Sequence, residues 1–258
     1  MKEAAQQTDI TMQTKELEQL ALPALVVNGS YAQITLRRPE QHNRIDPQDI
    51  QVIMAHLDDI ERNPDVRAIV LTGSGSKTFC SGYTLGAIQS QLDSHFEDML
   101  DRLEAISLPT ICALNGSVYG GGTDLAMCCD FRIGVTQSRM FMPAAKFGLH
   151  YYPGGLRRFV TRVGPNFTKK LFLTGQVIDA TEMLLAGYLT ELVTPGDLPA
   201  RIQAYVSAII AGEAGAISSM KHHIDALAAS AWPQAAGREA YQASLISPET
   251  IRRLNQLS

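Results

Sequence analysis

The sequence has little of what marks several common classes of protein. Its 258 residues include four cysteines, one tryptophan and only 7% aromatic residues. The cysteines show no Cys-x-x-Cys spacing, and two of them are adjacent: Cys80, Cys112, Cys128 and Cys129. We therefore expect no disulfide framework and a reducing compartment. No apolar run approaches the roughly 20 residues that cross a bilayer.

The sequence also lacks an excess of either charge. It has 22 basic and 26 acidic side chains, which leaves a net charge of −4. A broad basic surface is not expected, so we predict neither a nucleic-acid nor a membrane partner. The first ten residues, MKEAAQQTDI, have neither the apolar segment of a signal peptide nor the arginine enrichment of a transit peptide. These absences predict a cytoplasmic protein, and 45% apolar residues are ample for its core.

What the sequence does have is a fairly regular alternation of strand-like and helix-like segments. Residues 22–28 and 31–37 predict a hairpin around Gly29-Ser30. Short apolar runs predict buried strands at 68–71 and 110–114, and further strands are expected at 131–135 and 189–193. Helical spacing predicts helices at 47–63, 86–105, 154–163, 165–174, 179–187, 198–211 and 214–229, with Asp46 and Asp179 as N-caps. We expect a flexible leader at 1–20, a core at 21–197 and a C-terminal helical region at 198–258.

The most informative stretch is LNGSVYGGGTDLAMCCD, residues 114–130. Three glycines, at positions 120–122, follow a strand-like run and open a helix that reaches about Cys129. Glycine lets a ligand approach the backbone closely, and the first N–H groups of a helix favour negative charge. An anionic group, or one that becomes anionic, is expected there. The loop TGSGSKTFCSGYTLG resembles a P-loop only superficially, because Ser76 stands where glycine must precede Lys77.

Four blocks carry a resemblance to a known family: LRRPEQHNRID, VRAIVLTGSGSKTFCSG, LPTICALNGSVYGGGTDLAMCCDFRIG and LFLTGQVIDATEMLLAGYLTELV. In this order and spacing they resemble the crotonase superfamily, the enoyl-CoA hydratase and isomerase group, from about residue 22 to 230. The resemblance implies an α/β fold built as a spiral of ββα units with a C-terminal helical region. It also implies an acyl-CoA thioester substrate, coenzyme A as part of that substrate with no separate cofactor or metal, and a homotrimer or a dimer of trimers.

The family stabilises a thioester enolate with two backbone N–H groups. By resemblance these are the N–H groups of Tyr83 and Gly121. Further residues are implied to bind substrate: His42, Arg44, Ser81, Thr84, Leu85, Gly120 and Ala144. Arg37 and Arg38, beside the first of these, are candidates to meet phosphates, although such residues are more often simply solvated.

The acid–base groups depart from the family pattern. Hydratases of the family hold water between two glutamates, whose positions here are Asp124 and Ala144. Water held by two carboxylates is therefore not expected, which argues against ordinary enoyl-CoA hydration. Asp124 matches the aspartate of dienoyl-CoA isomerases, but an aspartate in the first turn also stabilises a helix without any catalytic role.

The run Gly148-Leu149-His150-Tyr151-Tyr152 offers compensating groups. By ungapped alignment, Tyr152 lies where dienoyl-CoA isomerases and benzoyl-CoA dehalogenases have an aspartate, and Tyr151 where methylmalonyl-CoA decarboxylase-like members have a tyrosine. A phenol can donate a proton or position a carboxylate, and His150 can shuttle a proton. The alternative is that both tyrosines only pack the core or a subunit interface.

The leading hypothesis is an acyl-CoA enzyme in which Asp124 moves a proton, assisted by Tyr151 or Tyr152. Isomerisation or hydration of an unusual enoyl-CoA comes first, and decarboxylation or carbon–carbon bond hydrolysis second. The rival hypotheses are a non-catalytic acyl-CoA-binding protein and, more weakly, a nucleotide-binding protein. The pair His222-His223 has no companion at ligand spacing and favours helix packing or surface over a metal site.

Overall fold

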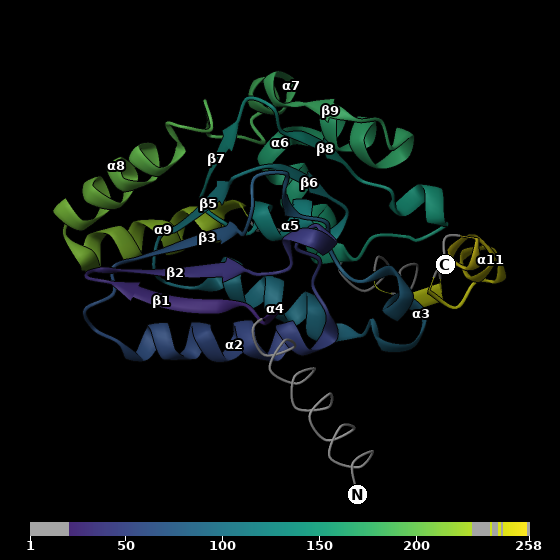
Figure 1. Ribbon diagram of the computed structural model, residues 1–258, viewed down its shortest axis with the longest axis horizontal. Helices are drawn as coiled ribbons and strands as arrows, with labels where there is room; N and C mark the ends of the chain where they lie inside the picture. The colour runs from purple at the N-terminus through teal and green to yellow at the C-terminus, as the bar shows by residue number, and fades with distance from the viewer. Residues whose placement is uncertain (1–20, 229–237, 239–241, 244, 257–258) are drawn as a thin grey trace, which may run out of the picture.

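The computed structural model describes residues 21–228, 238, 242–243 and 245–256. In this part of the chain the strands form two sheets (Figure 1). The larger has the order β1-β2-β3-β5-β7-β10, and the smaller has the order β4-β6-β8-β9. Strands of the larger sheet are β1 (Ala24–Asn28), β2 (Tyr31–Leu36), β3 (Ala68–Gly73), β5 (Thr110–Leu114), β7 (Phe131–Val135) and β10 (Glu191–Val193). Strands of the smaller are β4 (Thr78–Cys80), β6 (Ser117–Tyr119), β8 (Arg139–Phe141) and β9 (Ile178–Asp179).

From β3 to β8, strands that follow one another in the chain alternate between the two sheets. Each of β3, β5 and β7 lies in the large sheet and is followed by a short strand of the small sheet, β4, β6 and β8, and then by helical structure. In the large sheet β5 pairs in parallel with β3 and β7, and in the small sheet β6 pairs in parallel with β4 and β8. The chain therefore repeats a ββα unit, which confirms the predicted fold class. As a result, the turns after β4, β6 and β8 are brought to one edge of the small sheet.

The helices follow the predicted apolar spacing, with one main difference. α2 (Pro47–Arg62) begins at Asp46, which forms a capping box with Asp49 as expected of a helix with proline at its first position. The stretch predicted as one helix from 86 to 105 is broken into η2 (Leu85–Ala87), α3 (Ile88–Gln91) and α4 (Ser94–Ala105). The break occurs because Asp93 accepts a hydrogen bond from the His95 N–H at 3.0 Å and so caps a new helix.

The two helices predicted at 154–163 and 165–174 form α6 (Pro153–Thr174), which is interrupted at Gly164. Gly164 has φ 74° and ψ 163°, and Pro165 follows it, so the helical hydrogen bonding is broken there. The shorter helical elements are α5 (Gly121–Met127), η1 (Pro39–Gln41), η3 (Ala144–Phe147) and α7 (Ala180–Leu185). Asp179 caps α7 as predicted, since its Oδ1 accepts from the Glu182 N–H at 2.8 Å.

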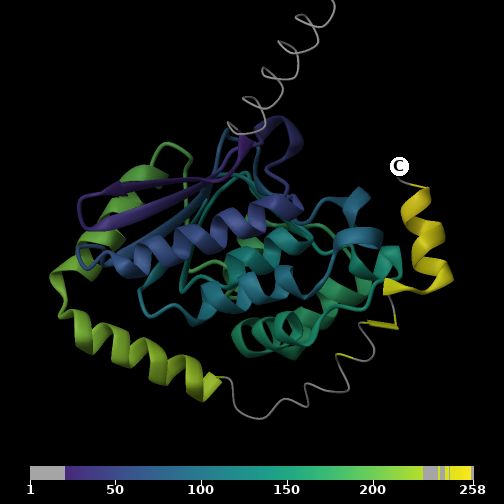
Figure 2. The same cartoon turned by 90° about the horizontal axis from the view of Figure 1, so that it is seen from below.

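The C-terminal helices occupy two separate places. α8 (Leu198–Ala211) packs on β3, β5 and β7, and α9 (Ala214–Ala228) follows it at the same end of the molecule. α11 (Pro248–Asn255) lies at the other end (Figure 2), against η3, where the Thr250 hydroxyl donates to the Gly148 carbonyl at 2.8 Å. The predicted leader at 1–20 lies outside the described residues. None of the described helices combines the length and apolar character that crossing a bilayer requires.

Glu97, in the first turn of α4, is a buried acid with incomplete pairing. Its side chain is 3% exposed, and its Oε2 lies 2.7 Å from the Arg238 guanidinium. Within the described residues its Oε1 has no hydrogen-bond partner. Burial raises the pKa of Glu97 to about 7; Arg238 opposes this rise, whereas Asp101 and Asp98 add to it.

This pKa predicts a pH-dependent loss of stability. As the pH rises from 4.5 to about 7, Glu97 ionises in the unfolded chain but stays protonated in the folded one, so the free energy of unfolding falls. The full loss, about 3 kcal/mol, is present above pH 7. Glu97→Gln should match the wild type in acid and exceed it by about this amount in mild base. Denaturant titrations across pH check this, with Asp98→Asn as an exposed control; a pH-independent difference would contradict it.

Candidate active site

A small cavity lies where the turns after β4 and β6 meet the segment between β8 and α6. It encloses about 90 Å³. One wall is formed by Ser81, Tyr83 and Leu85, and the glycine loop contributes Gly120 and Gly121. The opposite wall includes five of the residues singled out from the sequence or next to them in the chain: Pro143, Ala144, His150, Tyr151 and Tyr152. Residues 81–85, 120–121 and 143–152, which are separate in the sequence, therefore meet at one cavity.

The backbone N–H groups of Tyr83 and Gly121 are brought close together by glycines. Gly82 has φ +86°, and a Cβ there would lie 2.5 Å from the Gly121 nitrogen. Gly120 has φ +50°, also favoured by glycine, and its N–H is held by the Phe141 carbonyl at 3.0 Å. Among the described residues, neither the Tyr83 N–H nor the Gly121 N–H donates to another protein group. Two donors are thus left available at the cavity wall.

Asp124 lies behind this cavity and does not line it. Its side chain is completely buried and forms a two-pronged ion pair with Arg158. Arg158 Nε donates to Oδ1 at 2.8 Å, and its Nη2 donates to Oδ2 at 3.0 Å. Both carboxylate oxygens of Asp124 are thus engaged by one guanidinium. Asp124 therefore acts on the cavity only through its neighbours.

Those neighbours are the two tyrosines. Tyr152 is buried and donates its hydroxyl proton to Asp124 Oδ2, while Arg158 Nη2 donates to the phenol oxygen at 3.3 Å. The Tyr151 hydroxyl lies 3.3 Å from the same Oδ2, and the two rings are 4.5 Å apart. Tyr152 is the N-cap residue of α6, with Pro153 at the first helical position, so the helix start fixes the approach of both phenols to α5.

Arg158 is the principal site residue that the sequence analysis missed. It is completely buried, and its Nη1 also contacts the α4 carboxylates of Asp101 at 2.7 Å and Glu104 at 3.1 Å. Burial acts against its charge, but Asp124 and its other partners outweigh this and raise the pKa of Arg158 further above the ordinary value. Burial also opposes ionisation of Glu104, yet Arg158, Arg157 and Arg162 together lower the pKa of that carboxyl. This network ties α4, α5 and α6 together behind the tyrosines.

A glycine pair made this arrangement possible. At Gly155 a Cβ would lie 2.3 Å from the Tyr151 ring and 2.8 Å from Asp124 Oδ2. Gly154 lies against Asp101 Oδ1 in the same way, at 3.0 Å. The run Gly154-Gly155, followed by Arg157-Arg158, was the available signal in the sequence. From the sequence alone, this run does not show which helix packs against the glycines or that the packed group is charged.

The residues predicted to bind substrate separate into two groups. Ser81, Leu85, Gly120 and Ala144 line the cavity, but His42, Arg44 and Thr84 do not. The His42 ring contacts the Thr78 hydroxyl at 2.9 Å, Arg44 pairs with Asp46 at 2.9 Å, and the Thr84 hydroxyl bonds the same Asp46 carboxylate. The segment that carries His42 and Arg44 lies beside the cavity, because the N–H of the next residue, Ile45, donates to the Gly82 carbonyl at 2.8 Å. A role in holding coenzyme A stays a prediction.

Three further candidates can be placed. Arg38 is buried against Asp46 and Asp49 rather than solvated or exposed to a phosphate. His150 is exposed at the cavity. His222 and His223 are exposed on α9, with ring centres 5.8 Å apart. In the part of the chain that the structure describes, no three histidine, cysteine or acidic side chains gather as metal ligands would.

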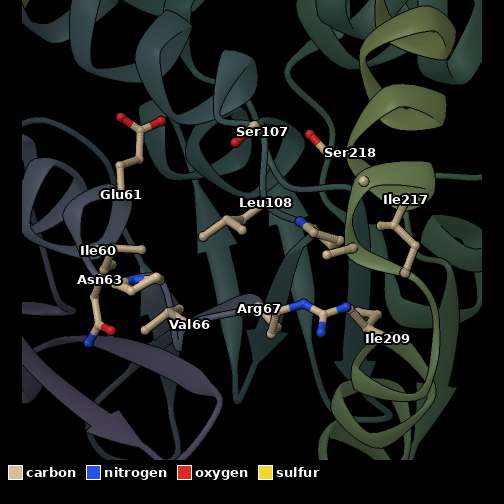
Figure 3. Close-up of a pocket in the computed structure, with 14 residues that line it drawn as sticks. Ile60, Glu61, Asn63, Val66, Arg67, Ser107, Leu108, Ile209, Ile217 and Ser218 are labelled. Atoms are coloured by element: carbon tan, nitrogen blue, oxygen red, sulfur yellow. The ribbon is translucent and has the colours of Figure 1, made fainter.

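A larger depression lies elsewhere. It encloses about 490 Å³ between the end of α2, the α4–β5 connection and the start of α9 (Figure 3). Arg67 crosses it and donates to the Gly212 carbonyl at 2.9 Å. None of its lining residues belongs to the predicted site. Size alone therefore does not identify the functional cavity.

Comparisons with known proteins agree with the geometry. Residues 27–252 match the enoyl-CoA hydratase/isomerase family. The chain is 30% identical over 207 residues to a putative enoyl-CoA hydratase/isomerase, YngF, of Bacillus subtilis, covering 78% of this chain and 80% of the relative. It is 29% identical to the short-chain-enoyl-CoA hydratase of Clostridium acetobutylicum, covering 76% and 78%. A solved methylmalonyl-CoA decarboxylase complexed with 2S-carboxypropyl-CoA shares the fold, with a TM-score of 0.84, 23% identity and coverage of 91% and 94%.

Proposed function

Because the chain belongs to the enoyl-CoA hydratase/isomerase family, we propose that it is an enzyme that converts an acyl-CoA thioester through an enolate held by the N–H groups of Tyr83 and Gly121. The observation that carries this proposal is the pair of available donors at the cavity wall. A thioester oxygen placed between them gains negative charge as the enolate forms. Donors fixed in advance stabilise that charge more than they stabilise the neutral carbonyl, and each is worth about 3–4 kcal/mol.

Tyr151 is the group proposed to exchange a proton with the substrate. It lines the cavity, and its hydroxyl is directed by Asp124. Asp124 is assigned a positioning role, because its carboxylate is buried and paired with Arg158. Tyr152, the next residue in the chain, bonds the same Asp124 carboxylate and so helps to fix the position of Tyr151. His150, exposed at the cavity, is a second proton carrier in this scheme.

A second candidate reaction is decarboxylation of a thioester with a carboxylate on its α-carbon. It is favoured by one observation: none of the described residues that line the cavity is acidic. Loss of CO₂ breaks the bond to the α-carbon and leaves its electron pair there as the enolate, so no basic carboxylate is required. Tyr151 then supplies the proton to the α-carbon. The fold shared with a methylmalonyl-CoA decarboxylase is compatible with this alternative.

Deuterium exchange at the α-carbon of a bound acyl-CoA tests the enolate directly. We expect exchange in the wild type and a decrease of about 10²-fold or more in Tyr151→Phe, because general acid–base groups contribute on this scale. Tyr205→Phe is the matched control, since that phenol lies on α8, bonds Glu191 of β10 and does not line the cavity. Release of CO₂ from malonyl-type thioesters, against turnover of enoyl thioesters, separates the two reactions. Tight binding with neither exchange nor turnover would indicate a non-catalytic acyl-CoA-binding protein.

The remaining expectations are part of the same proposal. Coenzyme A enters as the carrier portion of the substrate, without a separate cofactor. The protein acts in the cytoplasm as a homotrimer or a dimer of trimers, and sedimentation velocity measures that state.

A further inference from the structure

We propose, building on the function above, that Asn43 and Thr123 are positioning residues that direct the two proposed oxyanion donors from behind. The C=O of one residue and the N–H of the next belong to one planar trans peptide and point in opposite directions. Each donor N–H, of Tyr83 or of Gly121, therefore shares a peptide with the carbonyl of the glycine before it. A hydrogen bond that fixes this carbonyl also fixes the direction of the donor on the other side of the peptide.

The carbonyl of Gly120 is held by Thr123, in the first turn of α5. The Thr123 hydroxyl donates to it at 2.7 Å, and the Thr123 N–H donates to the same oxygen at 3.0 Å. Thr123 is completely buried, so water has little access to compete for this oxygen. Tyr188 anchors the threonine in turn, because its buried hydroxyl donates to the Thr123 carbonyl at 2.9 Å. The Gly121 N–H, on the other side of the held peptide, is left pointing away from Thr123 at the cavity wall.

The carbonyl of Gly82 is held in the same way by the segment 42–45. The Ile45 N–H donates to it at 2.8 Å, and the Ile45 carbonyl accepts from the Thr84 N–H at 3.0 Å. These two bonds lie on either side of Tyr83, whose own N–H points away from Ile45. A displacement of segment 42–45 would therefore turn the peptide that carries the Tyr83 donor.

Segment 42–45 has a backbone that requires support. Among the residues that the structure describes, His42 and Asn43 are the only ones other than glycine with positive φ, at 55° and 51°. Residues with a side chain are rarely stable in this region, and they persist there only where their surroundings hold them. Two such residues in succession, directly before a segment that bonds a donor peptide, indicate that the conformation has a function beyond connecting the chain.

The support is the side-chain amide of Asn43, which is completely buried. Its Nδ2 donates to the carbonyls of Ser74 and Thr78, both at 2.8 Å. Its Oδ1 accepts from the Arg38 N–H at 3.0 Å and from the Ser74 hydroxyl at 3.1 Å. Both hydrogens and both lone pairs of the amide are thus used. The amide fixes segment 42–45 to the connection between β3 and β4, and through it the direction of the donor.

Thr123→Val tests the Gly121 donor, because valine keeps the shape of threonine and removes the hydroxyl. We expect kcat to fall about tenfold and KM to stay within about twofold, since a misdirected donor is felt chiefly in the transition state. Thr123→Ser should restore most of the rate. Thr168→Val is the matched control: that buried hydroxyl donates to the Gly164 carbonyl at 2.8 Å within α6, away from the cavity. Wild-type kcat in a folded Thr123→Val protein would overturn the role of Thr123.

Asn43→Gly tests the other donor, because glycine tolerates positive φ and removes only the amide. We again expect kcat to fall about tenfold with little change in KM. Asn115→Gly is the matched control, since that amide accepts from the Gly73 N–H at 3.1 Å, close to the same connection, without bonding segment 42–45. Wild-type kcat in a folded Asn43→Gly protein would overturn the role of Asn43. If this variant does not fold, Ser74→Ala replaces it: kcat should fall about twofold to threefold, and an unchanged kcat would overturn the role.

The carbonyl stretch of a bound thioester separates this inference from the proposed function. Butyryl-CoA labelled isotopically at its carbonyl should show, by infrared difference spectroscopy, a shift to lower frequency on binding the wild type, because donors directed at the oxygen polarise the bond. The shift should be smaller in Thr123→Val and in Asn43→Gly. A wild-type shift that both folded variants keep in full would overturn this inference and leave the proposed function intact. No shift in the wild type would overturn the proposed donors, and this inference with them.

Discussion

Replacing Arg158 by methionine is expected to lower the free energy of unfolding by about 3–5 kcal/mol. The guanidinium is completely buried and pairs with Asp124, which is also completely buried. Methionine fills much of the same volume but leaves the Asp124 charge without its cation in a region that water does not reach. Two α4 carboxylates, Asp101 and Glu104, lose a partner in the same step. Urea denaturation of the purified variant measures the loss.

Two matched variants separate charge compensation from packing. Arg157→Met removes the neighbouring arginine, which is 17% exposed and shares Glu104 with Arg158 and Arg162, so we expect a loss of about 1 kcal/mol or less. Combining Arg158→Met with Asp124→Asn removes both charges and keeps an amide oxygen for the tyrosine hydroxyls. This double variant should be more stable than Arg158→Met alone. If it is less stable, or if Arg157→Met costs as much as Arg158→Met, the buried pair does not have the role assigned to it.

The same network explains why the site was only partly predictable from the sequence. The glycines at 120–122 were recognisable because a run of three after a strand-like segment is a local feature of the sequence. By contrast, the environment of Asp124 depends on Arg158, 34 residues further on, and that of Arg158 depends on α4, more than 50 residues earlier. An arginine in a helix normally extends to solvent, and no local pattern indicates that three acids surround this one. The proton-transfer role predicted for Asp124 was drawn without that information and is replaced here by a proposed positioning role.

The fold was more predictable than the site, for a physical reason. The strands β3 and β5 of the large sheet are continuous apolar runs buried on both faces, and such runs are distinctive. Strands of the small sheet have only two or three residues, too few to show a period, and only the family resemblance implied them. The break between α3 and α4 was missed because Asp93 acts as a cap inside a stretch with helical composition.

Gly82→Ala is expected to lower kcat by about 10²–10³-fold, the effect of losing one donor to a developing oxyanion. The new methyl carbon would lie 2.5 Å from the Gly121 nitrogen and 3.0 Å from that of Gly122, so the two loops must separate. The φ of +86° adds strain for any side chain. Once the loops separate, the N–H groups of Tyr83 and Gly121 no longer converge on one oxygen. Because the chemical step depends on that convergence more than ground-state binding does, kcat should fall more than the affinity for acyl-CoA.

Gly86→Ala provides the comparison within the same loop. Gly86 is exposed, has an ordinary φ, and a Cβ there meets nothing within 4 Å, so its kcat should stay within about twofold of the wild type. Circular dichroism and thermal unfolding establish that both variants are folded before their rates are compared. A folded Gly82→Ala enzyme with nearly wild-type kcat would mean that the thioester oxygen is not held between these two loops. The donors would then have to be sought elsewhere along the cavity.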